Sequence, residues 1–220
     1  MLATILGFLA ARLCRGSLRW ARLLAALPLV LWAAFSTPES SLVVMHQVRP
    51  PGWKDGVCLQ STGFTCAPAA AATVLSVHGV QTDESEMAAR CETRECGTFM
   101  ADVAKGLGAM LPPHEFSIYY ARITPAELRQ IHLPCVTCNT SGPRYTHAWV
   151  VFRINSDGTM EVGEGGQGRQ TVSWQGFTGT FTGETVVIVP KSAPSPEAAR
   201  VYSELEASGR AIASFGVPSG

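Results

Sequence analysis

The chain has 220 residues, a length typical of one globular domain with an appendage. Basic and acidic residues balance at 17 each, and 46% of all residues are hydrophobic. No basic stripe runs along the sequence, which argues against nucleic acid as a partner. No tract is charged or repetitive enough to predict long disorder.

The first 36 residues predict a membrane anchor or a signal segment. Two apolar runs, Met1–Ala11 and Leu23–Phe35, flank a basic stretch from Arg12 to Arg22. Each run is shorter than the ~20 apolar residues that comfortably span a bilayer, so one membrane helix, two short ones and a signal peptide are all compatible. Because basic flanks stay in the cytoplasm, residues after Ser36 are expected on the opposite side of the membrane.

The next part of the chain predicts a linker and then several helices. Residues 37–57 are rich in Pro, Gly and Ser and are expected to be a linker. Thr65 to Gly79 predicts a helix with a threonine N-cap and a terminal glycine. Shorter helices are expected at 83–91, at 98–107 and from Thr124, the first and last opening with capping sequences.

The later part of the chain predicts strands. Short segments rich in Val, Ile and aromatic residues occur at Glu115–Ala121, Pro134–Asn139, His147–Ile154, Thr159–Val162, Gln170–Trp174 and Glu184–Pro190. Helices followed by strands predict an α+β fold with an antiparallel sheet, here assigned to residues 58–192. Residues 193–220 are expected to form an amphipathic helix, Ser195–Phe215, and a frayed tail.

Six of the seven cysteines follow the membrane segment, and an oxidising compartment would let some of them pair. Cys91 and Cys96 could close a small loop, and either Cys135 or Cys138 could bond Cys58. Cys135 and Cys138 are expected on opposite faces of a strand, so a bond between them is disfavoured. A zinc site of four thiolates is the alternative, but the C-x2-C spacing of zinc ribbons occurs only once. Disulfides are favoured, and no metal or cofactor is assigned.

Cys66 is the candidate nucleophile. It opens the alanine-rich helix, and a helix N-terminus favours the reactive thiolate. A buried structural cysteine is the commoner role on a helix. Two further residues favour the catalytic role of Cys66 over the structural one. Gln60 could donate its amide to an oxyanion beside the Cys66 backbone N–H, and His147 begins an apolar strand that could bring its ring to the thiol.

This pattern resembles the bacteriocin-processing peptidases, which are papain-like cysteine peptidases that remove double-glycine leader peptides. The resemblance rests on Gln60, five residues, Cys66-Ala-Pro-Ala-Ala, an acidic short helix, Gly97-Thr98, and His147 at the head of a Val-rich strand. It extends from about Cys58 to Pro190. It implies a papain-like fold in which N-terminal helices pack on a C-terminal antiparallel sheet, and a peptide or protein substrate.

The resemblance also implies a carboxylate that orients the histidine. Counting along the strands places Glu164 where the family has an aspartate. The sequence departs from the family pattern there, and at Ala67, which replaces the glycine that usually follows the nucleophile. Asp157 is the rival acid, but it lies in a Ser-Asp-Gly turn. Glu164 is preferred, because the base must be held at the near end of its strand.

The function expected from the sequence is a membrane-associated cysteine peptidase whose domain faces away from the cytoplasm. Cys66 would form a thioester acyl-enzyme, with His147 as base. Two alternatives stay open: a catalytically degenerate domain that only binds peptides, and a thiol acyl-transferase or amidase. Family members usually join the peptidase domain to an exporter, and this chain has no ATPase, so a separate exporter is a candidate partner.

Overall fold

An antiparallel sheet organises the part of the chain that the structure, a computed structural model, describes: residues 48, 52–143, 145–192 and 195–212. Seven described strands follow the order β7-β6-β5-β4-β8-β3-β9. Every neighbouring pair is antiparallel. The strands are β3 (Phe116–Arg122), β4 (Cys135–Thr140), β5 (Thr146–Ile154), β6 (Thr159–Glu164), β7 (Gly168–Ser173), β8 (Phe181–Pro190) and β9 (Ala211–Ile212). The predicted α+β class and antiparallel sheet are confirmed.

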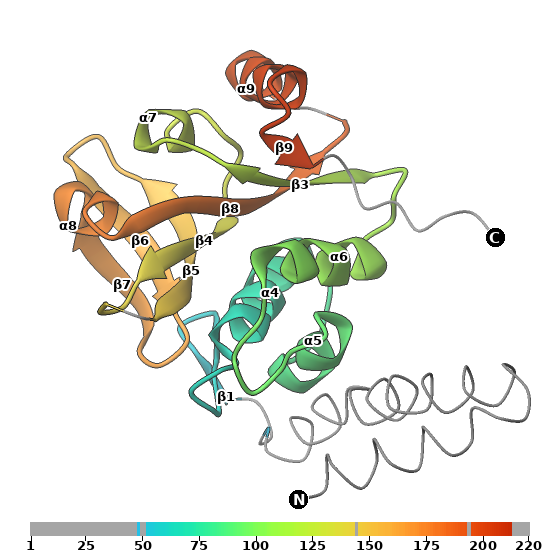
Figure 1. The fold of residues 1–220 in the computed structure, drawn as a ribbon, viewed down its shortest axis with the longest axis vertical. Helices are drawn as coiled ribbons and strands as arrows, with labels where there is room; N and C mark the ends of the chain where they lie inside the picture. Colours follow the sequence, from blue (N-terminus) through green and yellow to red (C-terminus); the bar gives the residue numbers. More distant parts are fainter. Residues whose placement is uncertain (1–47, 49–51, 144, 193–194, 213–220) are drawn as a thin grey trace, which may run out of the picture. The chain divides into compact units, whose positions relative to one another are not determined.

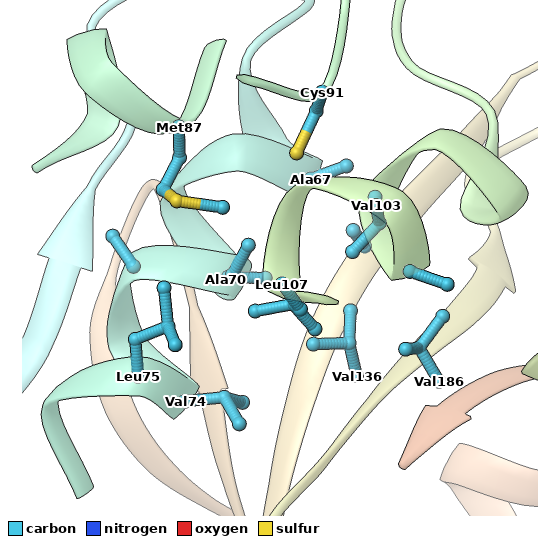
Figure 2. Close-up of a cluster of buried hydrophobic side chains, with 14 of the residues drawn as sticks. Ala67, Ala70, Val74, Leu75, Met87, Cys91, Val103, Leu107, Val136 and Val186 are labelled. Carbon is cyan, nitrogen blue, oxygen red and sulfur yellow. The ribbon is translucent and has the colours of Figure 1, made fainter. Parts of the chain in front are cut away.

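Three helices precede the sheet in sequence: α4 (Cys66–Val77), α5 (Glu84–Arg90) and α6 (Met100–Met110). α4 and α6 cover one face of the sheet, and α5 packs on α4 and α6 (Figure 1). α4 contacts β4 and β5, and α6 contacts β3 and β8. Figure 2 shows side chains of α4, α5 and α6 meeting strand residues such as Val136 and Val186 in one apolar cluster. The predicted packing of N-terminal helices on the sheet is therefore confirmed.

α4 is alanine-rich because it is surrounded. Four consecutive alanines, at 69–72, are at most 5% exposed, so the helix has no free side on which larger side chains would fit. Alanine also has the lowest cost of all residues in a helix. Small side chains thus let α4 approach the sheet, α5 and α6 together, and this close packing fixes the position of the residue that begins the helix.

The opposite face of the sheet carries α7 (Pro125–Leu128), α8 (Trp174–Thr178) and α9 (Pro196–Ala207). α7 opens with the predicted capping box at Thr124. The C-terminal helix ends earlier than predicted. Gly209 adopts a φ of +67°, and the N–H of Arg210 bonds back to the carbonyl of Leu205, so the chain leaves the helix and β9 joins β3.

A hairpin replaces the end of the expected linker. β1 (Gly52–Lys54) and β2 (Val57–Leu59) pair across Asp55-Gly56, and both turn residues have positive φ. Such a turn matches the right-handed twist of its strands and favours Asp-Gly. Val57 is 1% exposed, and β2 contacts α4. The hairpin therefore packs on the domain just before the segment that leads to Cys66.

The described cysteines are all free thiols, so the predicted disulfides are wrong for this structure. Cys91 is buried and its sulfur is turned toward the core cluster, whereas Cys96 is exposed (Figure 2). Cys135 and Cys138 lie in clusters on opposite faces of the sheet, as their spacing predicted. Of these two, Cys138 is the one that shares a cluster with Cys58. No group of three or more His, Cys, Asp or Glu side chains among the described residues could hold a metal ion, so the alternative zinc site is also not formed there.

The segment expected to associate with a membrane, residues 1–36, lies outside the described residues. Within the described part of the chain, no helix is long and apolar enough to cross a bilayer.

Candidate active site

Cys66 is the first residue of α4, as predicted, but its neighbour Thr65 does not cap the helix with its side chain. The Thr65 hydroxyl instead bonds Thr62 within the preceding loop, at 2.8 Å between the two side-chain oxygens. The first N–H groups of a helix lack acceptors inside the helix. Leaving them uncapped by Thr65 keeps the positive end of α4 available to charge on the Cys66 sulfur.

The surroundings of Cys66 favour its thiolate. Burial raises the pKa of the thiol, but this is outweighed by a hydrogen bond with the His147 side chain, by backbone N–H donors at Ala148 and Ala67 and by the charge of His147, so that the pKa is lowered. Burial raises the pKa of Cys58 and of Cys91 to about 12 each. Cys66 thus differs chemically from the buried structural thiols, since only a thiolate is a strong nucleophile.

His147 lies at the start of β5, where its ring meets both Cys66 and Glu164. The ring nitrogen Nε2 contacts the Glu164 carboxylate oxygen Oε1, which leaves Nδ1 for the hydrogen bond with the thiol. The pKa of His147 is raised to about 9. The hydrogen bond with Cys66 is the largest cause, and the charges of Cys66 and Glu164 add to it, whereas burial lowers the pKa. The lowered pKa of the Cys66 thiol and the raised pKa of the His147 imidazole together favour a thiolate–imidazolium pair.

Glu164 ends β6 and is 7% exposed. Its Oε1 also accepts the N–H of Gly166 at 3.0 Å. A Cβ atom at Gly166 would lie 3.2 Å from the other carboxylate oxygen, so glycine permits this approach of the backbone. The rival acid, Asp157, accepts hydrogen bonds from the backbone and hydroxyl of Thr159 in its turn. The structure therefore brings Glu164, and not Asp157, to the histidine.

Gln60 lies in the loop before Cys66, held on both sides. Its backbone N–H donates to the Gly165 carbonyl at 2.8 Å, and its side-chain Nε2 donates to the Thr62 carbonyl at 2.9 Å. A side-chain amide has two N–H donors, so one remains after the bond to Thr62. The side-chain oxygen of Gln60 packs on Gly165, where a Cβ atom would approach it to 2.9 Å.

Glu84 is a site residue that sequence reasoning missed. It was expected only as part of the capping sequence of α5, where Asp83 indeed accepts the N–H of Glu86. The Glu84 side chain is completely buried, and its Oε1 accepts the backbone N–H of Ser61 at 2.7 Å, in the loop between Gln60 and Cys66. An acid at the start of a short helix carries no sequence signal of this contact, because the partner is 23 residues away.

A cleft of about 730 Å³ opens at the thiol. Cys66 and His147 line it together with Gly97, and two strongly exposed aromatic side chains, Phe99 and Tyr145, stand at its walls. Exposed aromatic groups beside the Cys66 thiol are suited to contact an extended apolar ligand.

The fold and the site together define a papain-like α+β protein whose helix-initial cysteine meets a histidine and a carboxylate. The chain belongs to the Peptidase C39 family, a family of cysteine peptidases, whose model matches residues 54–193. The family resemblance predicted from the sequence is confirmed.

An uncharacterized protein of Methanothermobacter marburgensis is 31% identical over 134 residues, covering 59% of this chain and 84% of the relative. One from Methanothermobacter thermautotrophicus is 30% identical over 137 residues, covering 60% and 87%.

Two solved structures share the fold. The peptidase domain of Streptococcus ComA, a bifunctional ABC transporter involved in quorum sensing, superposes with a TM-score of 0.53 at 17% identity, covering 60% of this chain and 96% of that domain. A double-glycine-motif protease from an AMS/PCAT transporter, in complex with its leader peptide, gives 0.53 at 18% identity, covering 65% and 100%.

Proposed function

We propose that the chain is a cysteine endopeptidase in which Cys66 forms a thioester with the substrate and His147 is its acid–base partner. The observation that carries this proposal is the contact of His147 with Cys66 on one side and Glu164 on the other, at the cleft. A thiol, an imidazole and an orienting carboxylate in this order form the general arrangement of nucleophile, base and orienting group.

The proposed reaction begins with attack of the Cys66 thiolate on the peptide carbonyl carbon. A carbon–sulfur bond forms, and the carbonyl π electrons move to oxygen. The Cys66 backbone N–H and the remaining amide N–H of Gln60 stabilise this oxyanion. The imidazolium of His147 protonates the leaving amine as the carbon–nitrogen bond breaks. His147 then takes a proton from water, which attacks the thioester and releases the acid and the thiol.

The proposed substrate is a peptide with two glycines before the scissile bond, in keeping with the family and with the leader complex of the AMS/PCAT protease. Glycine at 97 and exposed aromatic groups at 99 and 145 suit a narrow passage bordered by an apolar contact surface. Because the peptidase domains in both solved structures come from transporters, we propose that an exporter is the partner.

Labelling with a peptide electrophile that ends in two glycines tests this function. Mass mapping should find the adduct on Cys66, and Cys66→Ala protein should neither be labelled nor cleave a peptide of the same sequence. Cys96 is exposed in the same cleft, so Cys96→Ser is the matched control and should behave like the unchanged protein. Cleavage by Cys66→Ala would refute the proposed nucleophile.

We further propose that residues 1–36 attach the protein to a membrane and place the peptidase domain outside the cytoplasm. Four arginines and no acidic residue occur before residue 37, and the positive flank of an apolar segment stays in the cytoplasm. A reporter enzyme that works only outside the cytoplasm, fused at Gly220, should be active in cells. Activity of a cytoplasm-only reporter at the same residue would reverse this orientation.

A further inference from the structure

A second cavity, of about 540 Å³, adjoins the cleft at His147. We call it the His147 pocket. Ser141 and His147 line both cavities, whereas Cys66 lines only the cleft and Glu164 only the His147 pocket. The imidazole therefore stands where the two cavities meet. Apart from His147 and Glu164, the residues that line this pocket take no part in the steps proposed so far.

The chemistry of acyl transfer gives the two cavities different occupants. The acyl half of the substrate becomes bonded to Cys66 and must stay on the thiol side, in the cleft. The leaving amine must lie against the His147 ring, because that ring gives it a proton. The chain that follows the scissile bond therefore continues past His147, in the direction in which the second cavity opens.

Resting on the proposed peptidase function, we propose that the His147 pocket binds the side chain of the residue directly after the scissile bond and selects an uncharged, apolar or aromatic one. Trp149 and Phe177 form an aromatic wall of the pocket, with ring centroids 6.1 Å apart in an edge-to-face arrangement, and Val172 adds an aliphatic surface. Aromatic walls favour aromatic and branched apolar partners.

The pocket is held open by hydrogen bonds between its own walls. The Asn139 side chain is buried and donates to the Phe177 carbonyl at 3.3 Å and to the Thr180 hydroxyl at 3.0 Å. The backbone N–H of Thr140 donates to the Thr180 carbonyl at 2.8 Å. These bonds tie β4 to α8 and to the segment between α8 and β8, so the pocket exists before a ligand arrives, as ligand sites usually do.

The lining is unsuited to a charged side chain. Among the described residues that line the pocket there is no Lys, Arg or Asp, and the Glu164 carboxylate is already engaged by His147 and Gly166. The charged groups that line the pocket, the His147 imidazolium and the Glu164 carboxylate, already contact each other, so a charged side chain entering here would lose hydration without gaining an unpaired opposite charge.

Peptides that share one acyl half and differ only in the residue after the scissile bond test the proposal. With Phe, Val, Ser, Lys or Asp at that residue, kcat/KM is expected to be highest for Phe and Val and lowest for Lys and Asp. The same acyl half joined to aminomethylcoumarin replaces that residue by one constant aromatic amine, so its hydrolysis reports whether the Cys66 and His147 chemistry is intact.

A charge change in the pocket should alter the preference. Gln167 is exposed and lines the pocket, whereas Gln175 on α8 is exposed and lines neither cavity. Gln167→Glu is expected to raise the kcat/KM for Lys relative to Phe by roughly three- to fivefold, the effect of one partly exposed ion pair. Gln175→Glu should leave both this ratio and the hydrolysis of the coumarin substrate unchanged, because Gln175 lines neither cavity.

The outcomes separate this proposal from the peptidase function. Equal kcat/KM for all five peptides, with normal hydrolysis of the coumarin substrate, would overturn the pocket assignment and leave the peptidase intact. A Lys-to-Phe ratio that moves equally in Gln167→Glu and Gln175→Glu would also overturn it. Failure to hydrolyse the coumarin substrate and to label Cys66 would refute the peptidase function, and the pocket assignment with it.

Discussion

Glu164 contacts Nε2 of His147 from the neighbouring strand, and the two side chains are diagonal neighbours on one face of the sheet. The direct cross-strand partner of Glu164 is Trp149, two residues beyond the histidine. Diagonal neighbours are within reach of long side chains, and glutamate has one more methylene than the aspartate of the family pattern. This contact turns the other ring nitrogen of His147 toward Cys66.

The first prediction is an order of effects among site variants. Cys66→Ala should abolish peptide cleavage, since no other group forms the thioester. His147→Ala should cause nearly the same loss of cleavage. Gln60→Ala should lower kcat by roughly 10²–10³, the usual loss for one oxyanion donor. Glu164→Gln should cost less than His147→Ala, because it misorients the base without removing it. Steady-state kinetics on one peptide measure all four.

The matched control for Glu164→Gln is Asp157→Asn. Asp157 lies in an exposed turn, where its carboxylate accepts hydrogen bonds from the backbone and the hydroxyl of Thr159. This variant should keep near-normal kcat/KM. A severe loss in Asp157→Asn with a mild one in Glu164→Gln would show that the orienting acid is assigned wrongly.

The second prediction concerns pH. The pKa of Cys66 is lowered, so cleavage should be lost only as pH falls through that lowered pKa and the thiolate is protonated. The pKa of His147 is raised to about 9, so cleavage should also fall as pH rises through about 9 and the imidazolium loses its proton. The kcat/KM profile should therefore be bell-shaped.

Alkylation of Cys66 separates the acidic limb of this pH profile, which depends on the thiolate, from the alkaline limb, which depends on the imidazolium. Iodoacetamide needs the thiolate but no proton donor, so the alkylation rate of Cys66 should not decline above pH 9. It should be followed in Cys96→Ser protein, because Cys96 is exposed. An alkylation rate that rises only near pH 9, which is the ordinary pKa of a cysteine thiol, would contradict the thiolate–imidazolium pair.

The third prediction couples Gln60 to Gly165. A Cβ atom at Gly165 would approach the Gln60 side-chain oxygen to 2.9 Å, so Gly165→Ala should displace the amide and lower kcat while Cys66 alkylation persists. In a Gln60→Ala background the same change should have little further effect, since the displaced group is absent. A double-mutant cycle on kcat measures the coupling. Additive losses would show that Gly165 does not act through Gln60.

The fourth prediction concerns folding. A Cβ atom at Gly106 of α6 would lie 2.5 Å from the Cys91 sulfur, so Gly106→Ala should reduce the free energy of unfolding by about 1–3 kcal/mol through overpacking. Adding Cys91→Ala removes the sulfur and should recover part of this loss. Urea denaturation of both single variants and the double variant checks the sign. Equal or greater destabilisation in the double variant than the sum of the singles would exclude this steric contact.

Local sequence patterns determined most of the regular structure. Asp83 and Thr124 cap their helices because a short polar side chain can reach N–H groups two or three residues ahead, whatever the rest of the chain does. The Asp55-Gly56 turn was equally local, yet a linker was predicted there, because the strands beside it are only three residues long. Gly209 is likewise a local signal for the end of α9, because a glycine with positive φ commonly follows the last helical residues.

The sequence by itself also determined that Cys66 begins a helix and that His147 begins a strand, and these are the properties that their spacing and neighbours encode. Only the tertiary structure decided which nitrogen of His147 meets the thiol, that Glu84 holds the loop at Ser61, and that a second cavity lies beyond the imidazole. It also decided that Cys91 stays a free thiol in the core. These features depend on contacts between segments far apart in the chain, and packing of whole elements sets such contacts, whereas periodicity and capping report only on neighbours within a few residues.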